Sequence, residues 1–407
     1  NDNIISDGRP SLGFTGNMDT YKPAEGSATR SDIAITDPDF KYPSLWKSNI
    51  AADYKFGDGW VATVELLYSK DINAIYHDNI GLYRTEQFVN DGGAGNARPY
   101  YNGYYSDREG NQKAANHVVM LRNTSKGHSL YTTFQLQKNF VDGILKGLYL
   151  NGSYSFGQSR GVTDGTSSVA TSAWKYRAAL DGNAEEVGYT AGSFDGRLLL
   201  SASYTANWSK YAATSFGLIY QRYRPFRYSY CYNGDANGDS QFSNDLMYIP
   251  ANFDEVKDHL LPGDFDSQED AWKAMNAFIE QDPYLSKHRG EYAERNGAVA
   301  PFANQLDLSV SHDIKIYQKN GRSHTLRFSF NIANFLNLLN RNWGVVQTTV
   351  LGNQQYQFLT IPKGQGPSAA NNYTLKYTMA KDLDETFKDN LNDVSRWQMQ
   401  FGIKYIF

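Results

Sequence analysis

The last twelve residues of the chain, 396–407, read RWQMQFGIKYIF and alternate between two kinds of side chain. Counting back in twos from the final residue gives a large apolar set: Phe407, Tyr405, Ile403, Phe401, Met399 and Trp397. The residues between them are polar or small, except Ile406. A period of two is that of a β-strand with one apolar and one polar face. With aromatic residues near both ends, the pattern favours a strand that faces lipid on one side and water on the other over a strand of a soluble sandwich.

The composition supports the same interpretation. The 407-residue chain contains 30 Tyr and 22 Phe, yet its mean hydropathy is −0.58. A transmembrane β-barrel combines these properties because alternate residues face water and aromatic girdles lie at both interfaces. No run of eighteen apolar residues occurs, so no transmembrane helix is expected. A net charge of −4 with mixed signs argues against a nucleic-acid partner. The single cysteine, Cys231, is expected to be a small buried side chain that fills space in the core.

Nine segments alternate in this way and are expected to form long antiparallel strands. Residues 198–208 are the clearest, with Leu198, Leu200 and Ala202 opposed by serines at 201 and 203. The nine expected strands are residues 44–56, 60–80, 115–141 (interrupted near 125–127), 146–159, 194–208, 211–231, 302–317, 323–339 and 394–407. Leu336 is placed on the apolar face of the eighth strand.

The connections between these strands alternate in length. Short turns are expected at 57–59, 142–145, 209–211 and 318–322, and long loops at 81–114, 160–193, 232–301 and 341–393. Residues 1–43 are also predicted to be a loop. Short turns on one side of a sheet and long loops on the other are typical of bacterial outer-membrane barrels, with the turns in the periplasm and the loops outside the cell.

The longest loop, 232–301, is an extracellular insertion in this interpretation and contains one predicted helix. Ser267 is the expected N-cap, followed by the acids Glu269 and Asp270 in the first turn. Four apolar residues then follow at helical spacing and predict the buried face: Ala271, Met275, Phe278 and Ile279.

An odd number of strands does not fit a complete barrel. Single-chain bacterial barrels have even strand numbers, and an open sheet would leave unpaired backbone groups in lipid. We therefore expect residues 1–407 to be the C-terminal part of one barrel domain, with an export signal and further strands in a preceding segment.

The insertion opens with a candidate metal site. Asp235, Asn237 and Asp239 have the i, i+2, i+4 oxygen spacing of the first half of an EF-hand loop. The second half departs from that motif, because Asp245 comes one position early and Ser240 stands where an EF-hand has glycine. Two interpretations stay open: a Ca²⁺ site formed by Asp235, Asn237, Asp239 and Asp245, or a solvated cluster of Asx-turns.

The other motifs give weaker indications of a binding or catalytic site. Residues 286–297 contain two arginines and two glutamates and suggest either a polar clamp between loop and sheet or a solvated charge run. The tyrosines at 100, 101, 104 and 105 could stack on a ligand, although loop packing is the more frequent role. The seven histidines lack ligand spacing, and no nucleophile elbow, P-loop or HExxH motif occurs, so enzymatic activity is not expected.

Several segments resemble one family. NIANFLNLLN at 331–340, followed by Trp343-Gly344, and SRWQMQFGIKYIF at 395–407 resemble the last two strands of TonB-dependent outer-membrane transporters. DPDFKYPSLWKSNIAADYKF, YSKDINAIY, LRNTSKGHS, NGDANGDSQFSNDLMYIP and KHRGEYAERNGAVAPFANQLDL resemble the Oar-like branch of Bacteroidota. The resemblance runs from about residue 36 to residue 407.

This resemblance implies a 22-stranded barrel in the outer membrane, plugged by an N-terminal domain that contacts TonB. It further implies active import of a nutrient such as a peptide, a glycan or another bulky ligand, with a surface lipoprotein as a candidate lid. Phe401, Ile403, Tyr405 and Phe407 resemble the signal that the barrel-assembly machinery recognises. The alternative is a barrel that does not transport but scaffolds a surface lipoprotein or a secretion assembly. The substrate-binding residues and the ligand are not readable from the sequence.

Overall fold

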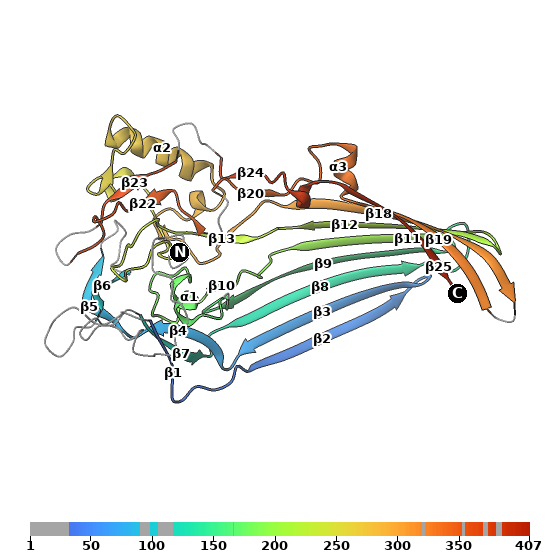
Figure 1. The fold of residues 1–407 in the computed structure, drawn as a ribbon, viewed down its shortest axis with the longest axis horizontal. Coiled ribbons are helices and arrows are strands. Elements are labelled where there is room, and N and C mark those ends of the chain that lie inside the picture. Colours follow the sequence, from blue (N-terminus) through green and yellow to red (C-terminus); the bar gives the residue numbers. More distant parts are fainter. Residues whose placement is uncertain are drawn as a thin grey trace, which may run out of the picture.

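The computed structural model describes residues 32–89, 98–104, 117–165, 167–319, 322–351, 355–368, 373–379 and 385–407. Its largest element is an antiparallel sheet of nine long strands that follow one another in chain order (Figure 1). The strands are β2 (Leu45–Phe56), β3 (Trp60–Asp71), β8 (His128–Asn139), β9 (Leu148–Gly161), β11 (Arg197–Ser209), β12 (Ala212–Tyr223), β18 (Ala303–Lys319), β19 (Arg322–Ala333) and β25 (Gln398–Ile406). The expected all-β fold and the nine antiparallel strands are thus confirmed.

Most of the sheet pairs in uninterrupted register. β2 and β3 pair over twelve residues each, from Leu45 opposite Asp71 to Phe56 opposite Trp60. Register shifts occur between Asn207 and Ser209 of β11 and between Lys315 and Tyr317 of β18. Both bulges lie near the end of the sheet that carries the short turns, where bulges commonly adjust strand twist. Among the described strands, β2 and β25 each have one neighbour and do not pair with each other.

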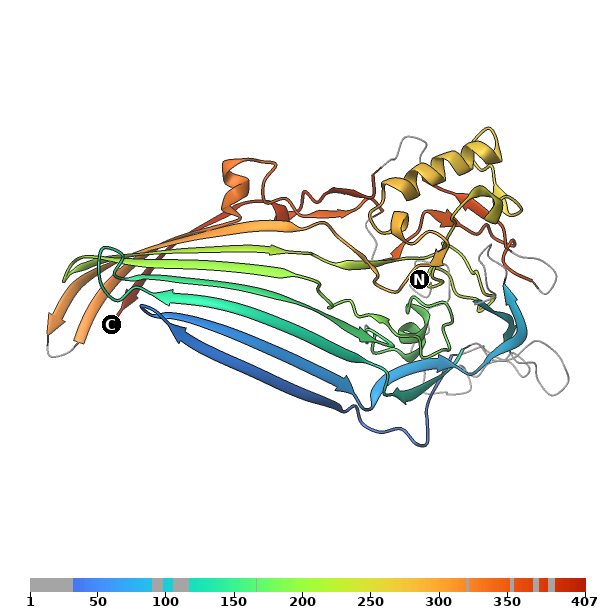
Figure 2. The same ribbon diagram turned by 180° about the vertical axis from the view of Figure 1, so that it is seen from behind.

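Short turns and long connections lie at opposite ends of the sheet (Figures 1 and 2). The β2–β3 turn contains Gly57 and Gly59 at φ 52° and 84°, a conformation that side chains other than glycine rarely adopt. β8 and β9 are joined at the same end through residues 140–147, and β11 and β12 through residues 210–211. The predicted sorting of connections by length is therefore present in the folded chain.

The long connections fold together into a layer of short elements, here called the loop layer (Figure 1). Its helices are α1 (Ala170–Lys175) and α2 (Gln268–Gln281), with 3₁₀ turns η2 (Phe253–Glu255) and η3 (Leu285–Lys287). The short helix α3 (Phe335–Leu339) lies apart from these, beside β18, and the Asn334 amide bonds it to the 3₁₀ turn η4 (Asp393–Ser395) (Figure 1). The strands of the loop layer are β1 (Ile33–Thr36), β4 (Ala74–Asn79), β5 (Leu82–Val89), β6 (Arg98–Tyr104), β7 (Val118–Thr124), β10 (Gly188–Tyr189), β13 (Arg227–Tyr230), β14 (Tyr248–Ile249), β15 (Leu260–Leu261), β16 (Glu291–Tyr292), β17 (Ala298–Val299), β20 (Gln347–Thr349), β21 (Gln355–Tyr356), β22 (Leu359–Thr360), β23 (Leu375–Tyr377) and β24 (Phe387–Asp389).

The hydrophobic core of the described residues lies in this loop layer rather than on the sheet. It is rich in tyrosine: Tyr228, Tyr230, Tyr356 and Tyr373 are at most 1% exposed. The predicted helix is confirmed as α2, whose Ser267 side chain accepts a hydrogen bond from the Asp270 N–H at 3.1 Å. The four residues predicted for its buried face are all at most 1% exposed and join the same core.

Three of the expected long strands end earlier than predicted. The segment 60–80 leaves the sheet after Asp71, and its continuation, β4, pairs with β7 instead. The segment 211–231 breaks at Pro225, which has no N–H to donate to a ladder. The segment 323–339 ends at Ala333 because Asn334 adopts a left-handed conformation (φ 52°, ψ 52°), so Leu336 lies in α3 and the strand placement was wrong.

Several predicted loops contain regular structure. β5 and β6 form a hairpin within 81–114, and α1 lies within 160–193. β1 pairs parallel to β7, so residues 33–36 are a strand, whereas residues 1–31 lie outside the described part. These elements were missed because their hydrophobic residues pack against distant segments and show no sustained local period. Among the described residues, no helix is long and apolar enough to cross a membrane.

Candidate functional site

Most large apolar side chains of the nine long strands lie on one face of the sheet, whereas Leu67 and Ile219 lie on the other. The register makes the apolar face continuous, since Phe134 of β8 stands opposite Val64 of β3 and Tyr154 of β9. Phe134 is 47% exposed and Phe401 of β25 is 65% exposed. The largest exposed members are Trp46, Ile50, Tyr54, Phe56, Val64, Leu66, Tyr68, Leu130, Phe134, Leu136, Tyr154, Phe156, Leu200, Tyr204, Trp208, Phe216, Leu218, Ile314, Met399, Phe401, Ile403 and Tyr405. Soluble monomers rarely expose apolar patches beyond a few hundred Å², so this face needs an apolar environment.

The opposite face is polar, and its side chains bond to one another across neighbouring strands. On β8, Gln135 donates from its amide to Asn151 of β9 at 2.8 Å, and Arg327 of β19 forms a bidentate pair with Asp313 of β18. Similar pairs join Thr133 with Ser155, Thr205 with Ser215, and Ser309 with Asn331. Such a face suits contact with water or with a polar partner.

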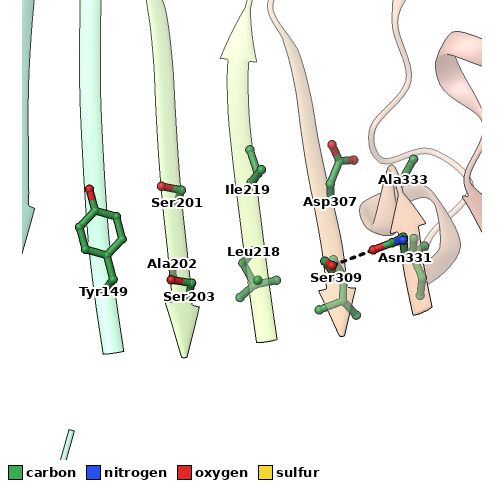
Figure 3. A pocket seen from close by; sticks show the side chains of 13 residues that line it. Tyr149, Ser201, Ala202, Ser203, Leu218, Ile219, Asp307, Ser309, Asn331 and Ala333 are labelled. Carbon is green, nitrogen blue, oxygen red and sulfur yellow. Dashed lines mark hydrogen bonds between the residues drawn. The ribbon is translucent and has the colours of Figure 1, made fainter. Parts of the chain in front are cut away.

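A pocket of about 450 Å³ lies across β9, β11, β12, β18 and β19 (Figure 3). It is lined mainly by residues of the polar face, and its floor is low because Ser201, Ser203 and Gly217 have small side chains. Asp307 and Asn331 border it, and Asn331 accepts a hydrogen bond from Ser309 at 2.7 Å (Figure 3). A ligand or protein segment seated here would approach the strand backbones closely.

The four residues proposed as an assembly signal lie together. Phe401, Ile403 and Tyr405 stand opposite Phe330, Phe328 and Leu326 of β19, all on the apolar face. Phe407 follows the last paired residue and is 90% exposed. Its ring stacks against Tyr405, with ring centroids 5.8 Å apart. The structure therefore brings the four together on one strand edge of the sheet.

The candidate metal-binding residues lie in the loop layer, in the connection between β13 and β14. Asp235 accepts the backbone N–H groups of Asn237, Gly238 and Ser240 at 2.6–3.1 Å and so closes the loop on itself. Gly238 has φ 83°, and a Cβ there would collide with the carbonyl oxygen of Tyr101 in β6. The Tyr101 N–H in turn donates to the Asn237 carbonyl at 2.7 Å, which seats the loop against β6.

Three carboxylates meet in this loop. Asp239 and Asp245 are at most 1% exposed. Burial, together with the neighbouring Asp235 carboxylate, raises the pKa of Asp239 to about 7. Burial and Asp239 raise the pKa of Asp245 well above its usual range, although the Arg98 guanidinium, 3.3 Å away, opposes this shift. The Asx-turns of the second interpretation are present, because the N–H groups of Asn237, Asp239 and Gln241 each bond to the side chain two residues earlier at 2.8–3.1 Å. The cluster is not solvated, however, since two of the three carboxyl groups are buried.

The four predicted ligands do not all converge. Asp245 pairs with Arg98 and accepts the Ala236 N–H at 2.7 Å, and Asn237 lies 3.4 Å from Asp239 through its amide nitrogen. Within the part of the chain that the structure describes, no group of three or more His, Cys, Asp or Glu side chains is arranged to hold a metal ion. A cation at this loop would therefore need amide or backbone oxygens as well as carboxylates.

The segment 286–297 forms the polar clamp that was one of its two interpretations. Arg295 is 3% exposed and donates to the carbonyl oxygens of Gly161 and Val162, at the loop end of β9. Glu294 pairs with Arg160 of β9, and the Asn296 amide donates to Asp164 at 2.9 Å. These bonds fix the insertion to the sheet.

The remaining candidates are structural. Tyr100 and Tyr101 are buried, and the Tyr101 hydroxyl donates to Asp181 at 2.7 Å, so these two do not offer stacking surfaces. The other tyrosines of that cluster lie outside the described side chains. Cys231 is fully buried and unpaired, as predicted.

Sequence reasoning missed Arg98, Gln241 and Asn244 as parts of the metal candidate. Gln241 and Asn244 lie within the acidic motif and are each 2% exposed. Amide oxygens are ordinary ligands of Ca²⁺, and this chemistry is the sequence signal that could have identified both residues. Arg98 precedes Asp245 by 147 residues, so no local sequence pattern predicts that their side chains pair. No family model, curated protein or solved structure matches this chain.

Proposed function

We propose that the chain is part of a transmembrane β-barrel of the bacterial outer membrane and acts in TonB-dependent import of a nutrient. One observation carries the barrel proposal: nine strands in unbroken order present an exposed apolar face and a polar face, with short turns and folded loops at opposite ends. The transport assignment rests on the resemblance of the chain to TonB-dependent transporters.

The dimensions of the apolar face support a lipid neighbour. On β2, exposed aromatic residues begin at Trp46 and end at Phe56. Ten residues of strand span about 33 Å, which a tilt of about 40° reduces to about 25 Å, the height of the apolar band of outer-membrane barrels. Trp46 at one end and Phe56 and Trp60 at the other then correspond to the two aromatic girdles.

The two unpaired sheet edges support a larger barrel. β2 and β25 each present one row of backbone groups without a partner among the described strands. Each such group would cost several kcal/mol in hydrocarbon, so lipid-exposed sheets close into barrels. In the proposal, further strands of the same protein join these edges to complete the 22-stranded barrel that the resemblance implies, and the polar face surrounds a plug domain.

The loop layer supports a role on the outer surface. It has its own buried core and is tied to the sheet by Arg295 and Glu294, so it forms an ordered cover over one end of the barrel wall. In the proposal this cover faces the medium and contributes to capture of a peptide, glycan or other bulky ligand. A surface lipoprotein is the proposed lid partner.

The test uses the full-length protein in its own cells. A chromosomally tagged version should co-sediment with the outer membrane, and a strain without the gene should lose growth on the imported nutrient, with peptone and mixed glycans as first probes. Deletion of tonB should produce the same growth defect. A protein found in the soluble fraction would contradict the barrel. An outer-membrane protein that co-purifies with secretion components, and whose loss spares nutrient uptake, would replace transport with the scaffolding alternative.

A further inference from the structure

The candidate metal loop brings three carboxyl groups together, and one of them has an ion pair within the described residues. Asp239 and Asp245 are buried and Asp235 is partly buried, and all three interact electrostatically. Within the described residues, the ion pair that involves these carboxylates joins Asp245 to Arg98 at 3.3 Å, and Arg98 also donates to the Leu246 carbonyl. With all three carboxylates ionised, two negative charges remain at Asp235 and Asp239. Uncompensated buried charge is costly, and a divalent cation would balance these two charges.

The same place holds oxygen atoms that have no partner. Asn244 is 2% exposed, and its amide N–H donates to the Asp239 carboxylate, yet its Oδ1 accepts no hydrogen bond within the described structure. Gln241 is also 2% exposed; its amide nitrogen lies 3.2 Å from His117 Nε2 and its backbone N–H bonds to Asp239 at 2.8 Å, but its Oε1 likewise has no donor there. Nearly all buried amide oxygens in folded proteins find a donor or a ligand, so both oxygens are available to a bound group.

The backbone of the loop suits an oxygen-ligated cation. Ser240 occupies the sixth position counted from Asp235 and has φ 65°, the left-handed conformation that glycine usually provides at that position of an EF-hand. The Asp235 carboxylate accepts three N–H groups and so orders the loop before any cation arrives. Asp245, one place early for the twelfth EF-hand ligand, is instead held by Arg98.

We propose that this loop binds one Ca²⁺ ion through the carboxylates of Asp235 and Asp239 and the amide oxygen of Asn244, with Gln241 as a further oxygen donor. Asp245 is a positioning residue that ties the site to Arg98 of β6. The mixed set of carboxylate and amide oxygens suits Ca²⁺, which takes six to eight oxygen ligands in flexible geometry, better than Mg²⁺, which demands a regular octahedron. Because the Asn237 carbonyl bonds to β6, the ion would stabilise the contact between the insertion and β6.

The binding test uses the purified full-length protein in detergent with Tb³⁺ as a luminescent Ca²⁺ substitute. Trp174 can sensitise the lanthanide, because its indole and the Asp239 carboxylate flank the same backbone position, Gly182. We expect sensitised emission on addition of TbCl₃, displaced by CaCl₂ at concentrations at least tenfold lower than by MgCl₂. EGTA should lower the melting temperature of the protein, and CaCl₂ should restore it.

The decisive variant is Asp239→Asn, which removes one charged ligand without changing side-chain size. It should weaken Tb³⁺ and Ca²⁺ binding at least tenfold, whereas Asp254→Asn, at an exposed carboxylate of the same insertion, should bind as the wild type does. If Asp239→Asn does not fold, Asn244→Ala provides the second test with the same expected direction. Absence of emission and a melting temperature indifferent to EGTA in the wild-type protein would overturn the site. None of these outcomes depends on the proposed transport activity.

Discussion

The sheet and the loop layer place their large apolar side chains in opposite environments. In the loop layer, large apolar residues such as Phe278 and Tyr356 are buried to 1% exposure or less, as in a water-soluble domain. In the sheet, residues of the same kind, such as Phe134 and Phe401, point away from the protein and remain about half exposed. The contrast teaches that the loop layer supplies its own apolar interior, whereas the sheet depends on an apolar environment outside it.

The largest expected effect is on the assembly of the sheet. Phe407→Ala removes the exposed ring that ends the apolar row of β25, and we expect it to abolish accumulation in the outer membrane. Ile406→Ala, on the other face of the same strand, is the matched control and should accumulate normally. Immunoblots of outer-membrane fractions measure both, and a normal level of Phe407→Ala would remove the assembly role.

A substitution that creates a cavity in the loop layer should test whether its core unfolds independently of the sheet. Phe278 of α2 packs against Phe358, with ring centroids 5.0 Å apart, and Phe278→Ala should cost about 3–5 kcal/mol of loop-layer stability. Hydrogen exchange should quicken at β13 and β22 while the β8–β9 ladder stays protected. Phe242→Ala, at a 62% exposed ring in the same insertion, should change neither. Equal loss of protection in both regions would merge them into one cooperative unit.

A charge on either face of β8 should distinguish lipid from water. Phe134→Arg places a cation near the middle of the apolar face and, if that face meets lipid as proposed, should destabilise the sheet by about 2–4 kcal/mol. Gln135→Arg, one residue away on the polar face, should cost far less because its neighbour there is Asn151. Urea unfolding in lipid vesicles compares the two, and similar losses for both would contradict the lipid-facing assignment.

A helix cap should give a smaller, local effect. Ser267→Ala removes the acceptor for the Asp270 N–H and should cost about 1 kcal/mol, detected as faster hydrogen exchange in the first turn of α2. Ser267→Thr keeps the hydroxyl, which accepts from the Asp270 N–H and donates to the Asp270 carboxylate at 2.8 Å, and should retain protection. Equal loss of protection in the Thr and Ala variants would point to packing of the serine rather than to capping.

The smallest effect is expected for an ion pair on the polar face. Arg327 and Asp313 are bonded at 2.6 and 2.7 Å, but both side chains are partly exposed, at 42% and 24%. A double-mutant cycle with Arg327→Met and Asp313→Asn should yield a coupling of less than about 1 kcal/mol. A larger coupling would indicate that this face is shielded from solvent by a partner such as a plug.

Local patterns were sufficient for the strands and for α2, because each depends on a short period. Alternation in 198–208 and 396–407 predicted the faces of β11 and β25, and the cap at Ser267 with four apolar residues predicted α2 and its buried side. The same patterns placed the strand ends too far along the chain. The ladder is broken there by Pro225 and by the left-handed Asn334, and alternation alone does not register such breaks.

The sequence by itself therefore determined the all-β class, the two-faced strands, the sorting of short and long connections and the acidic motif of the insertion. Only the tertiary structure decided that Tyr228, Tyr356 and Tyr373 from separate loop segments share one core, that Arg98 pairs with Asp245, and that the buried Gln241 and Asn244 keep amide oxygens without a partner. The physical reason is sequence distance. A period of two or 3.6 residues depends on neighbouring positions, whereas the partner of a buried charged group is the residue that the fold brings to it. For Asp245 this partner is Arg98, 147 positions away in the sequence.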